Sequence, residues 1–369
     1  MLDLRDVRRR ALCLPWRAAA TLGWRDAARP PVAFVVEKAD WAIRWVGENI
    51  ARKIEAAHPH IVATTETPER LANRVVHFGS QYMWLAWGEA MSPSNRYVTS
   101  FFHGKREDGP DVARHIDEFL RREPGLSRIV ASASLVRQRL IGWGVDPAKV
   151  VQIPIGVDMD LFRRPTDAER RAARVALGVP EGAIAIGSFQ KDGVGWGDGM
   201  EPKLIKGPDL LVETLIRLGK DLPVFAVLTG PARGYVRRGL EQAGIPYKHL
   251  YAAGHAELVQ CYHALDLYLV TSREEGGPMG LMESMSSGVP VVSTPVGMAP
   301  DLIVDGTTGG LTGPEDIAGL VQRSRDIIAD QTHRAALLDA AHLAVRPCDW
   351  NVVARDHYEQ VYLPLLQAA

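Results

Sequence analysis

Several features that would define a protein class are missing from this chain of 369 residues. Its three cysteines, Cys13, Cys261 and Cys348, lie far apart without C-x-x-C spacing, which argues against a zinc site and a disulfide framework. The formal net charge of −1 and the lack of interleaved aromatic and basic residues give no reason to expect a nucleic-acid partner. No G-x-G-x-x-G follows the first predicted strand of either half, so a nicotinamide dehydrogenase is disfavoured. The cysteine usage favours a reducing, cytoplasmic location.

The N-terminal segment lacks an apolar run long enough to span a bilayer. Pro15 interrupts the stretch that follows Arg8-Arg9-Arg10, so neither a signal peptide nor a membrane span is predicted. Arginines nevertheless interleave here with apolar residues, as in a helix that lies on a membrane surface. These apolar residues are Leu12, Leu14, Trp16, Leu22 and Trp24. The segment is either such an interfacial element, at the inner face of the membrane, or a leading helix or irregular arm that packs its leucines and tryptophans on the first domain.

Apolar strand candidates alternate with helical segments along the chain. Because strands separated by helices need crossover connections, this order predicts an α/β fold with parallel sheets covered on both faces. The first half contains strands at Val32 to Val36, Ile61 to Thr65, Arg74 to Phe78, Tyr97 to Phe102, Ile129 to Ala131 and Val150 to Ile153, and helices at Trp41 to Ala57, Gln81 to Glu89 and Ser134 to Trp143. The second half contains strands at Ala183 to Phe189, Val224 to Thr229, near Leu250 and at Leu265 to Val270, and helices at Leu210 to Leu218, Gly234 to Ala243 and Ala256 to Ala264. The length suits two such Rossmann-like domains, with a ligand bound outside the carboxyl ends of the strands in the cleft between them.

The most informative stretch runs from Ser272 to Glu283. It follows a predicted buried strand. Gly276-Gly277 indicates a tight turn, Pro278 the first residue of a helix, and Gly288 the residue that ends this helix. The stretch is therefore a strand-to-helix turn with carboxylates around the helix start.

Glu275 lies in that turn, and Glu283 lies in the second turn of the helix. Helical side chains lean toward the N-terminus, so the Glu283 carboxylate can reach back toward a ligand at that end. Backbone N–H groups and the positive end of the helix dipole can hold an anion such as a diphosphate. The residues that would supply these groups are Gly276, Gly277 and Met279.

With the following residues 286–297, Ser-Ser-Gly-Val-Pro-Val-Val-Ser-Thr-Pro-Val-Gly, the stretch resembles the signature of the retaining glycosyltransferases of family 4. These enzymes have the GT-B fold, which consists of two Rossmann-like domains. In their E-x7-E element one glutamate contacts the hydroxyls of the donor sugar and the other contacts the ribose hydroxyls. The resemblance implies that Glu275 is the sugar contact, as a catalytic residue, and that Glu283 is the ribose contact. Gly277 and Pro278 stand where the family usually has an aromatic residue and a glycine.

Candidate phosphate ligands precede this stretch. Lys206-Gly207-Pro208-Asp209 resembles the Lys-Gly-x-Asp element of the family, whose lysine contacts the donor diphosphate. Ser188 replaces a common arginine of the family, and Lys191 is the candidate to supply its charge. Residues Gly193 to Met200 form a glycine-rich insertion, expected to be a mobile loop whose aromatic residue covers the donor or acceptor. Gly230, after another predicted strand, would let the backbone approach the nucleotide.

The first domain contributes His103, which follows a predicted strand. The resemblance implies that it lies near the donor sugar and phosphate, where it could donate a catalytic hydrogen bond. The segment Pro154 to Phe162 resembles the interdomain segment of the family. We therefore expect an acceptor-side domain at residues 1–155, a donor domain at residues 156–348, and a C-terminal helix at residues 349–369 that packs back on the first domain.

The resemblance implies a hexosyltransferase. It would move a hexosyl unit from a nucleotide-diphosphate sugar, with UDP- and GDP-sugars as the expected donors, to a carbohydrate, lipid-linked or small-molecule acceptor. In front-face substitution the acceptor hydroxyl attacks on the side from which the diphosphate leaves, and the leaving phosphate acts as base. Lys206, Lys191 and the helix N-terminus would neutralise it, so no metal ion and no other cofactor is expected. A sugar-nucleotide epimerase of the same architecture and a non-catalytic nucleotide-sugar-binding subunit remain as alternatives.

Overall fold

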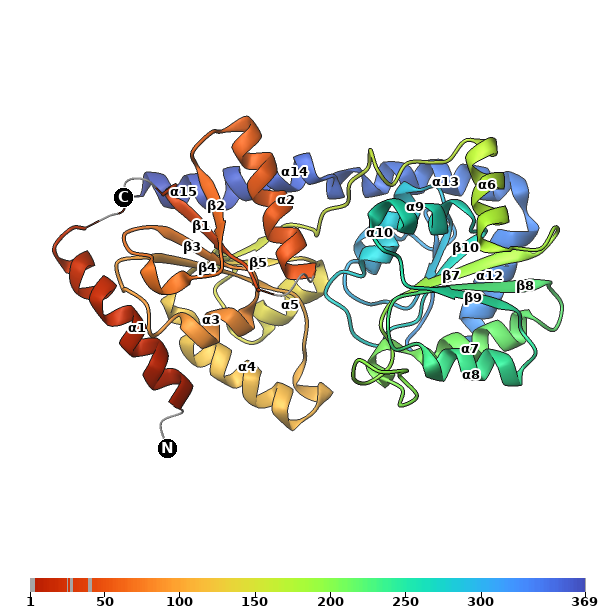
Figure 1. Ribbon diagram of the computed structural model, residues 1–369, viewed down its shortest axis with the longest axis horizontal. Helices are drawn as coiled ribbons and strands as arrows, with labels where there is room; N and C mark the ends of the chain where they lie inside the picture. The colour runs from red at the N-terminus through yellow and green to blue at the C-terminus, as the bar shows by residue number, and fades with distance from the viewer. Residues whose placement is uncertain (1–3, 25, 27–28, 39–41, 369) are drawn as a thin grey trace. The chain divides into compact units, whose positions relative to one another are not determined.

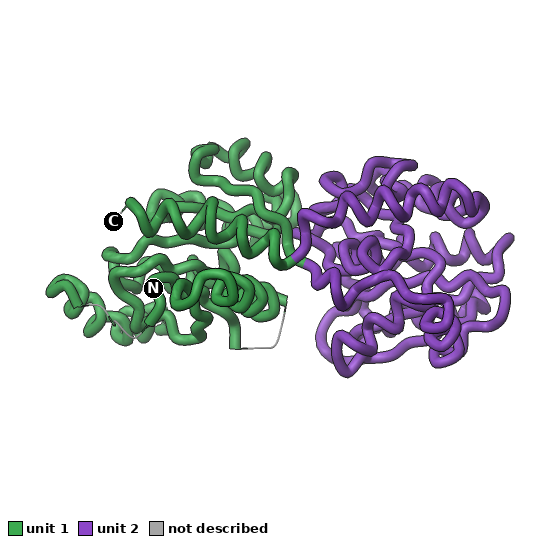
Figure 2. Tube along the Cα trace, turned by 90° about the horizontal axis from the view of Figure 1, so that it is seen from above, with its two compact units in different colours: residues 1–156, 350–369 green, residues 157–349 purple. Residues whose placement is uncertain are grey.

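The computed structural model describes residues 4–24, 26, 29–38 and 42–368. The chain divides into two compact units, coloured green and purple in Figure 2. Unit 1 comprises Met1–Gly156 and Trp350–Ala369, and unit 2 comprises Val157–Asp349. Each unit contains one six-stranded parallel sheet (Figure 1), so the predicted α/β class is confirmed.

The sheet of unit 1 has the strand order β2-β1-β3-β4-β5-β6. Its strands are β1 (Val32–Val35), β2 (Val62–Thr65), β3 (Val75–Phe78), β4 (Arg96–Phe101), β5 (Leu126–Ala131) and β6 (Val150–Gln152). Strands β1 and β3 are buried throughout, as strands in a parallel sheet with helices on both faces must be. The helices along this part of the chain are α1 (Leu4–Thr21), α2 (Ala42–Ala57), α3 (Gln81–Trp87), α4 (Pro110–Arg122) and α5 (Ser134–Gly142). Trp41, the predicted start of α2, lies outside the described residues.

The C-terminal residues belong to unit 1. They form α14 (Trp350–Asp356), a π-helical turn (His357–Tyr362) and α15 (Leu363–Gln367), and α14 packs against α2. A buried polar network fixes this segment to the sheet. The Nδ1 atom of His77 in β3 lies 2.7 Å from the Tyr362 hydroxyl, and its Nε2 atom lies 3.0 Å from the Ser100 hydroxyl in β4. Because both ring nitrogens have partners, burial of this imidazole costs less than burial of an unpaired one.

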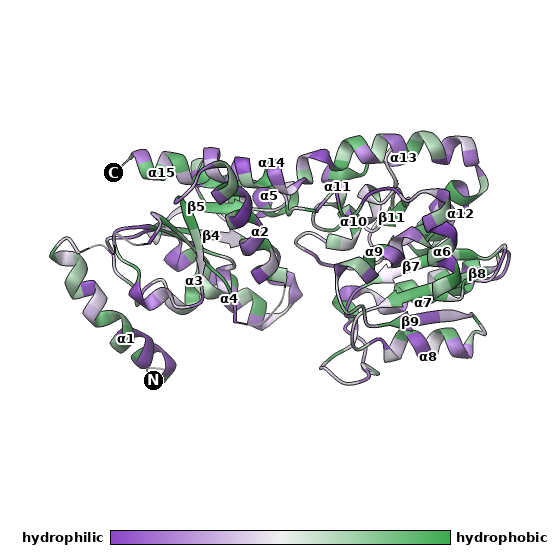
Figure 3. Ribbon diagram, turned by 45° about the horizontal axis from the view of Figure 1, so that its top comes forward, coloured by the Kyte–Doolittle hydropathy of each residue, from purple (hydrophilic) through white to green (hydrophobic). Residues whose placement is uncertain are grey.

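Helix α1 packs on unit 1 with one face. Cys13 and Ala20 are buried in this face, and the Arg9 guanidinium lies 5.5 Å from the centre of the Trp87 ring. The leucines point the other way: Leu4 is 85 % exposed and Leu14 is 65 % exposed. The prediction of a leading arm that packs its leucines on the first domain is therefore wrong for these side chains. Figure 3 shows the alternation of hydrophobic and hydrophilic residues along α1.

The sheet of unit 2 has the order β12-β11-β10-β7-β8-β9. Its strands are β7 (Ile184–Phe189), β8 (Val224–Thr229), β9 (Tyr247–Leu250), β10 (Leu267–Val270), β11 (Val291–Ser293) and β12 (Gly310–Leu311). Its helices are α6 (Asp167–Leu177), α7 (Pro208–Leu218), α8 (Gly234–Gln242), α9 (His255–His263), α10 (Met279–Ser286), α11 (Ala299–Leu302), α12 (Ile317–Ala329) and α13 (Gln331–Val345). The core is aliphatic: Leu211, Leu228 and Leu267 are fully buried in one cluster from α7, β8 and β10.

Most predicted elements differ from the observed ones only at their ends. Pro278 is not the first residue of α10 but its N-cap, because its ψ of 107° is extended rather than helical. Helices α4, α6, α11, α12 and α13 and strands β11 and β12 were not predicted from the sequence.

Candidate functional site

The carboxyl ends of β7 and β10 lie next to each other in the sheet of unit 2, because these strands are paired. Residues that leave such ends face the crevice in which ligands of open α/β sheets bind. The segment after β7 begins with Gln190 and Lys191, and the segment after β10 contains Ser272 and Glu275. The short helical turn Leu204–Lys206 lies against both, so three stretches far apart in the sequence build one site.

Lys206 and Glu275 form an ion pair at the centre of this site. The Nζ atom of Lys206 lies 2.5 Å from Oε1 of Glu275, and the Ser272 hydroxyl donates to the same oxygen at 3.0 Å. Both charged side chains are largely buried, with 24 % and 14 % of their surfaces exposed. A charged hydrogen bond with so little access to water is stronger than an exposed one. The structure thus brings together the two residues predicted to contact the diphosphate and the sugar.

The backbone around Lys206 approaches β10 closely. The Thr271 hydroxyl donates to the Gly207 carbonyl at 2.9 Å, and the Gln190 amide group donates to the Lys206 carbonyl at 2.9 Å. Gly207 has a φ of +62°, and a Cβ atom there would lie 1.8 Å from the Thr271 carbonyl oxygen. Only glycine fits at this position, so steric exclusion explains why a glycine follows Lys206.

Two further lysines lie at this site. The Nζ atom of Lys191 lies 3.6 Å from the centre of the Trp196 ring, a cation–π contact. Lys203 was not predicted. Partial burial, and then the charges of Lys206 and Lys191, lower its pKa, whereas the Glu275 charge opposes them. The signal for Lys203 was its position three residues before Lys206, because it is the N-cap of the short helical turn that ends at Lys206.

Glu283 lies apart from the Lys206–Glu275 pair, inside α10. Its carboxylate is buried, and the hydroxyl of Tyr262 in α9 donates to its Oε2 atom at 2.7 Å. Burial raises the pKa of Glu283 to about 7, and the hydrogen bond from Tyr262 counteracts this rise. Burial, followed by the Glu283 charge, raises the pKa of Tyr262 well above its usual value. Sequence analysis missed Tyr262 because α9 and α10 become neighbours only in the fold.

The turn before α10 carries the predicted anion-binding amides. Gly276 and Gly277 connect Glu275 to Pro278, and Met279 begins the helix. Gly297 packs against this turn: a Cβ atom at Gly297 would lie 2.9 Å from the carbonyl oxygens of Glu275 and Gly276. The glycine at the end of the 286–297 stretch therefore supports the turn sterically.

Gly230 and His103 follow two other strands. Gly230 directly follows β8 with a φ of +88°, and its carbonyl oxygen lies 2.8 Å from Nε2 of His249. His103 follows β4 in unit 1 and is exposed, and the Gln81 side chain donates to its carbonyl oxygen at 3.3 Å. All the other predicted site residues lie in unit 2, so the role of His103 at a shared site stays a prediction.

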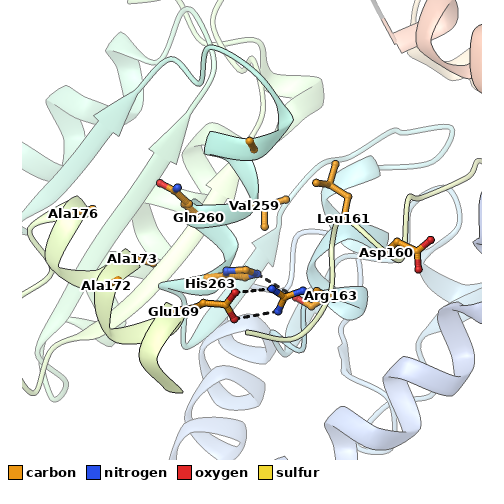
Figure 4. A pocket seen from close by; sticks show the side chains of 11 residues that line it. Asp160, Leu161, Arg163, Glu169, Ala172, Ala173, Ala176, Val259, Gln260 and His263 are labelled. Atoms are coloured by element: carbon orange, nitrogen blue, oxygen red, sulfur yellow. Dashed lines mark hydrogen bonds and ion pairs between the residues drawn. The ribbon is translucent and has the colours of Figure 1, made fainter. Parts of the chain in front are cut away.

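A separate cavity of about 490 Å³ lies in unit 2 between α6, α9 and residues 160–163 (Figure 4). Its wall is mostly apolar and includes Ala172, Ala173 and Ala176. At its edge Arg163 and Glu169 pair with each other at 2.5 Å, and Nε2 of His263 lies 3.1 Å from the Arg163 carbonyl oxygen. These polar groups are partners of one another, so they offer a ligand few groups for hydrogen bonding.

The described residues contain neither a metal-binding cluster nor a membrane-spanning helix. Nowhere in this part of the chain do three or more His, Cys, Asp or Glu side chains come together in a way that could hold a metal ion. Across the same residues, every helix is too short or too polar to cross a membrane.

Comparison with known proteins is consistent with this geometry. Residues 201–343, which carry both Lys206 and Glu275, match the family model described as glycosyl transferases group 1. The lipopolysaccharide core biosynthesis mannosyltransferase LpsB of Rhizobium meliloti is 28 % identical over 191 residues, which are 49 % of this chain and 51 % of LpsB. The D-inositol 3-phosphate glycosyltransferase of Geodermatophilus obscurus is 31 % identical over 220 residues, which are 55 % of this chain and 45 % of that enzyme. The chain thus spans about half the length of these curated relatives.

Solved structures resemble the whole chain in fold. The crystal structure of Anabaena Alr3699/HepE in complex with UDP superposes with a TM-score of 0.73 at 18 % identity, covering 92 % of this chain and 100 % of that one. The sucrose-phosphate synthase of Thermosynechococcus elongatus gives a TM-score of 0.70 at 17 % identity, again covering 92 % of this chain and 100 % of the other. These likenesses show the GT-B fold, and within unit 2 the match to the glycosyl transferases group 1 is confined to residues 201–343.

Proposed function

We propose that this protein transfers a hexosyl unit from a nucleotide-diphosphate sugar to an acceptor hydroxyl, with retention of the anomeric configuration. One observation carries the proposal: Lys206 and Glu275 are paired at 2.5 Å where β7 and β10 end, with Lys191 and Lys203 nearby. The three lysines can neutralise the charge of a diphosphate, and the Glu275 carboxylate, fixed by its partners, can accept hydrogen bonds from sugar hydroxyls. Residues 276–279 add amides at the start of α10.

In the proposed reaction the lysines bind the diphosphate and Glu275 positions the sugar. The diphosphate attracts Lys206 more strongly than a single carboxylate does, so donor binding frees Glu275 for the sugar hydroxyls. The bond between the anomeric carbon and the diphosphate oxygen breaks, and the acceptor oxygen bonds to the same face. The acceptor proton passes to the leaving diphosphate, whose charge Lys206, Lys191 and Lys203 neutralise. This arrangement requires no metal ion.

Glu283 is proposed to bind the ribose hydroxyls, and Gly230 to let the backbone approach the nucleotide. The HepE structures contain UDP and UDP-glucose, which supports a uridine nucleotide as the first donor to test. His103 is proposed to donate a hydrogen bond to the sugar or the leaving oxygen. The acceptor is a carbohydrate, a lipid-linked sugar or a small molecule.

Helix α1 favours a contact with the inner face of a membrane. Its outward face carries Leu4, Leu14 and, just beyond the helix, Leu22, which is 88 % exposed, together with Arg8. Apolar side chains flanked by arginines suit the interface of an anionic bilayer. Co-sedimentation with vesicles that contain anionic lipid tests this contact. A Leu4→Ser/Leu14→Ser variant should lose binding, and equal binding by this variant would contradict the proposal.

Calorimetry with UDP, GDP, ADP and TDP, and with their glucose and mannose conjugates, tests the donor site. Binding of one nucleotide in EDTA as tightly as in Mg²⁺ is expected. Lys206→Ala should weaken this binding by roughly tenfold to a hundredfold, as the loss of a charged hydrogen bond does. Lys220→Ala, at an exposed lysine of the same unit, is the matched control. If none of the nucleotides binds, the proposed function is wrong.

Product analysis separates the alternatives. NMR of the products from the donor that binds should show the transferred sugar with the anomeric configuration of the donor. An epimerised sugar released without any acceptor would instead indicate an epimerase. Tight donor binding without turnover across a panel of acceptors would indicate a binding subunit.

A further inference from the structure

A buried arginine contacts the backbone next to Lys191, one of the candidate phosphate ligands. Arg233, at the start of α8, is 1 % exposed. Its Nη1 atom donates to the carbonyl oxygens of Ser188 at 2.7 Å, Gln190 at 2.9 Å and Thr229 at 3.2 Å. One guanidinium group therefore ties the end of β7, the turn after it and the end of β8 together.

Asp192 is the counter-charge of this arginine. Its Oδ1 atom lies 3.1 Å from Nε of Arg233, and both side chains are completely buried. Within the described part of the chain, neither carboxylate oxygen of Asp192 takes part in a hydrogen bond of good geometry. Burial raises the pKa of Asp192 to about 6, although the Arg233 charge opposes this rise. A buried ion pair with unsatisfied oxygens contributes little net stability, so stability alone does not account for the pair.

The same pair anchors the insertion that was expected to be a mobile loop. Gly193 and Pro202 form an antiparallel bridge, and the Lys203 N–H donates to the Asp192 carbonyl at 2.8 Å. At the tip, the carbonyls of Asp198 and Gly199 accept from the first two amides of α8, at 2.6 and 3.0 Å. The insertion is thus a hairpin fixed to the helix that begins just after Arg233. Glycine permits this contact, because a Cβ atom at Gly199 would lie 2.2 Å from the Ala232 carbonyl oxygen.

Arg233 holds the chain on both sides of Lys191. It binds the carbonyl of the residue before Lys191, Gln190, and the side chain of the residue after it, Asp192. The backbone N–H of Lys203 also donates to the carbonyl oxygen of Asp192. We infer that Arg233, with Asp192, is a positioning residue that holds Lys191 and Lys203 where they bind the phosphates of the donor. This inference rests on the proposed function.

The conservative variant Arg233→Lys tests the inference because it keeps the buried positive charge. A single ammonium group cannot hold three carbonyl oxygens and a carboxylate at these positions. The affinity for UDP, measured by calorimetry, should fall about tenfold, while the affinity for uridine, measured by competition, stays within about twofold. A variant that merely loosens the fold would weaken both ligands alike. Arg238→Lys, at an exposed arginine of the same helix, is the matched control.

A second measurement uses the lysines themselves. In a Lys191→Ala/Lys203→Ala background, Arg233→Lys should reduce UDP affinity less than twofold, because residues that act as a unit give non-additive effects. Asp192→Asn provides a second variant in case Arg233→Lys does not fold, and it should also lower UDP affinity while sparing uridine. The inference would be overturned if both variants bound UDP as tightly as the unmodified protein does, or if their affinity for uridine fell in parallel with that for UDP. Full additivity with the lysine variants would overturn it as well. Failure of the unmodified protein to bind any nucleotide would instead overturn the proposed function, and the inference with it.

Discussion

The buried carboxyl group of Glu283 makes a quantitative prediction about stability. Its pKa in the folded protein is about 7, against a reference value of 4.5. Between these two values the folded chain holds a proton that the unfolded chain has released, so stability falls as pH rises. The full difference of 2.5 pKa units corresponds to about 3 kcal/mol, of which about 2.5 kcal/mol is lost between about pH 5 and about pH 8.

Glu283→Gln isolates this contribution. Glutamine resembles the protonated carboxyl group in shape, and its carbonyl oxygen can accept the hydrogen bond from the Tyr262 hydroxyl. At about pH 5 the variant and the unmodified protein should therefore differ little. At about pH 8 the variant should be the more stable, because only the unmodified protein then carries a buried negative charge.

Thermal unfolding followed by circular dichroism at both pH values measures the effect. For a unit of this size, about 2.5 kcal/mol corresponds to a relative rise in the melting temperature of about 5–10 °C for the variant. Glu181→Gln, at an exposed glutamate of the same unit, is the control and should give no such change. A difference between Glu283→Gln and the unmodified protein that is the same at both pH values would refute the reasoning.

Three further predictions concern the proposed donor site. Gly207→Ala should lower the melting temperature by about 6–12 °C, because a left-handed φ and a Cβ atom 1.8 Å from the Thr271 carbonyl oxygen together cost about 3 kcal/mol. As a control, Gly254→Ala should leave the melting temperature unchanged, because a Cβ atom at Gly254 meets nothing within 4 Å. Equal effects of the two substitutions would refute the steric argument. Lys206→Ala should flatten the salt dependence of UDP binding, since it removes one cation proposed to contact the phosphates, and an unchanged slope in a NaCl titration would argue against that contact. UDP binding should change the tryptophan fluorescence, because Lys191 then leaves the indole ring of Trp196, a residue that is 64 % exposed. Trp196→Leu should abolish this change. A change retained in full would show that another tryptophan reports binding.

Sequence patterns predicted the fold class because strands in parallel sheets are continuous apolar runs. Val224–Thr229 was predicted with its observed ends. Helix α4 was missed because most of its residues are polar or charged, and α6 was missed because most of its apolar residues are alanines, which mark a buried face only weakly. Pro278 was taken as the first helical residue because proline suits that position, but its observed ψ leaves it as the N-cap.

The sequence by itself determined the α/β order of the chain and placed Lys206, Glu275 and Glu283 in segments typical of a sugar-nucleotide site. Only the tertiary structure decided which of these side chains meet. Lys206 and Glu275 are 69 positions apart, and they pair because β7 and β10 are neighbours in the sheet. The pairing of Tyr262 with Glu283 and that of Arg233 with Asp192 likewise depend on packing between separate elements. Hydrophobic periodicity records which face of an element is buried, but the contacts that shift a pKa or position a lysine depend on which elements the fold makes neighbours.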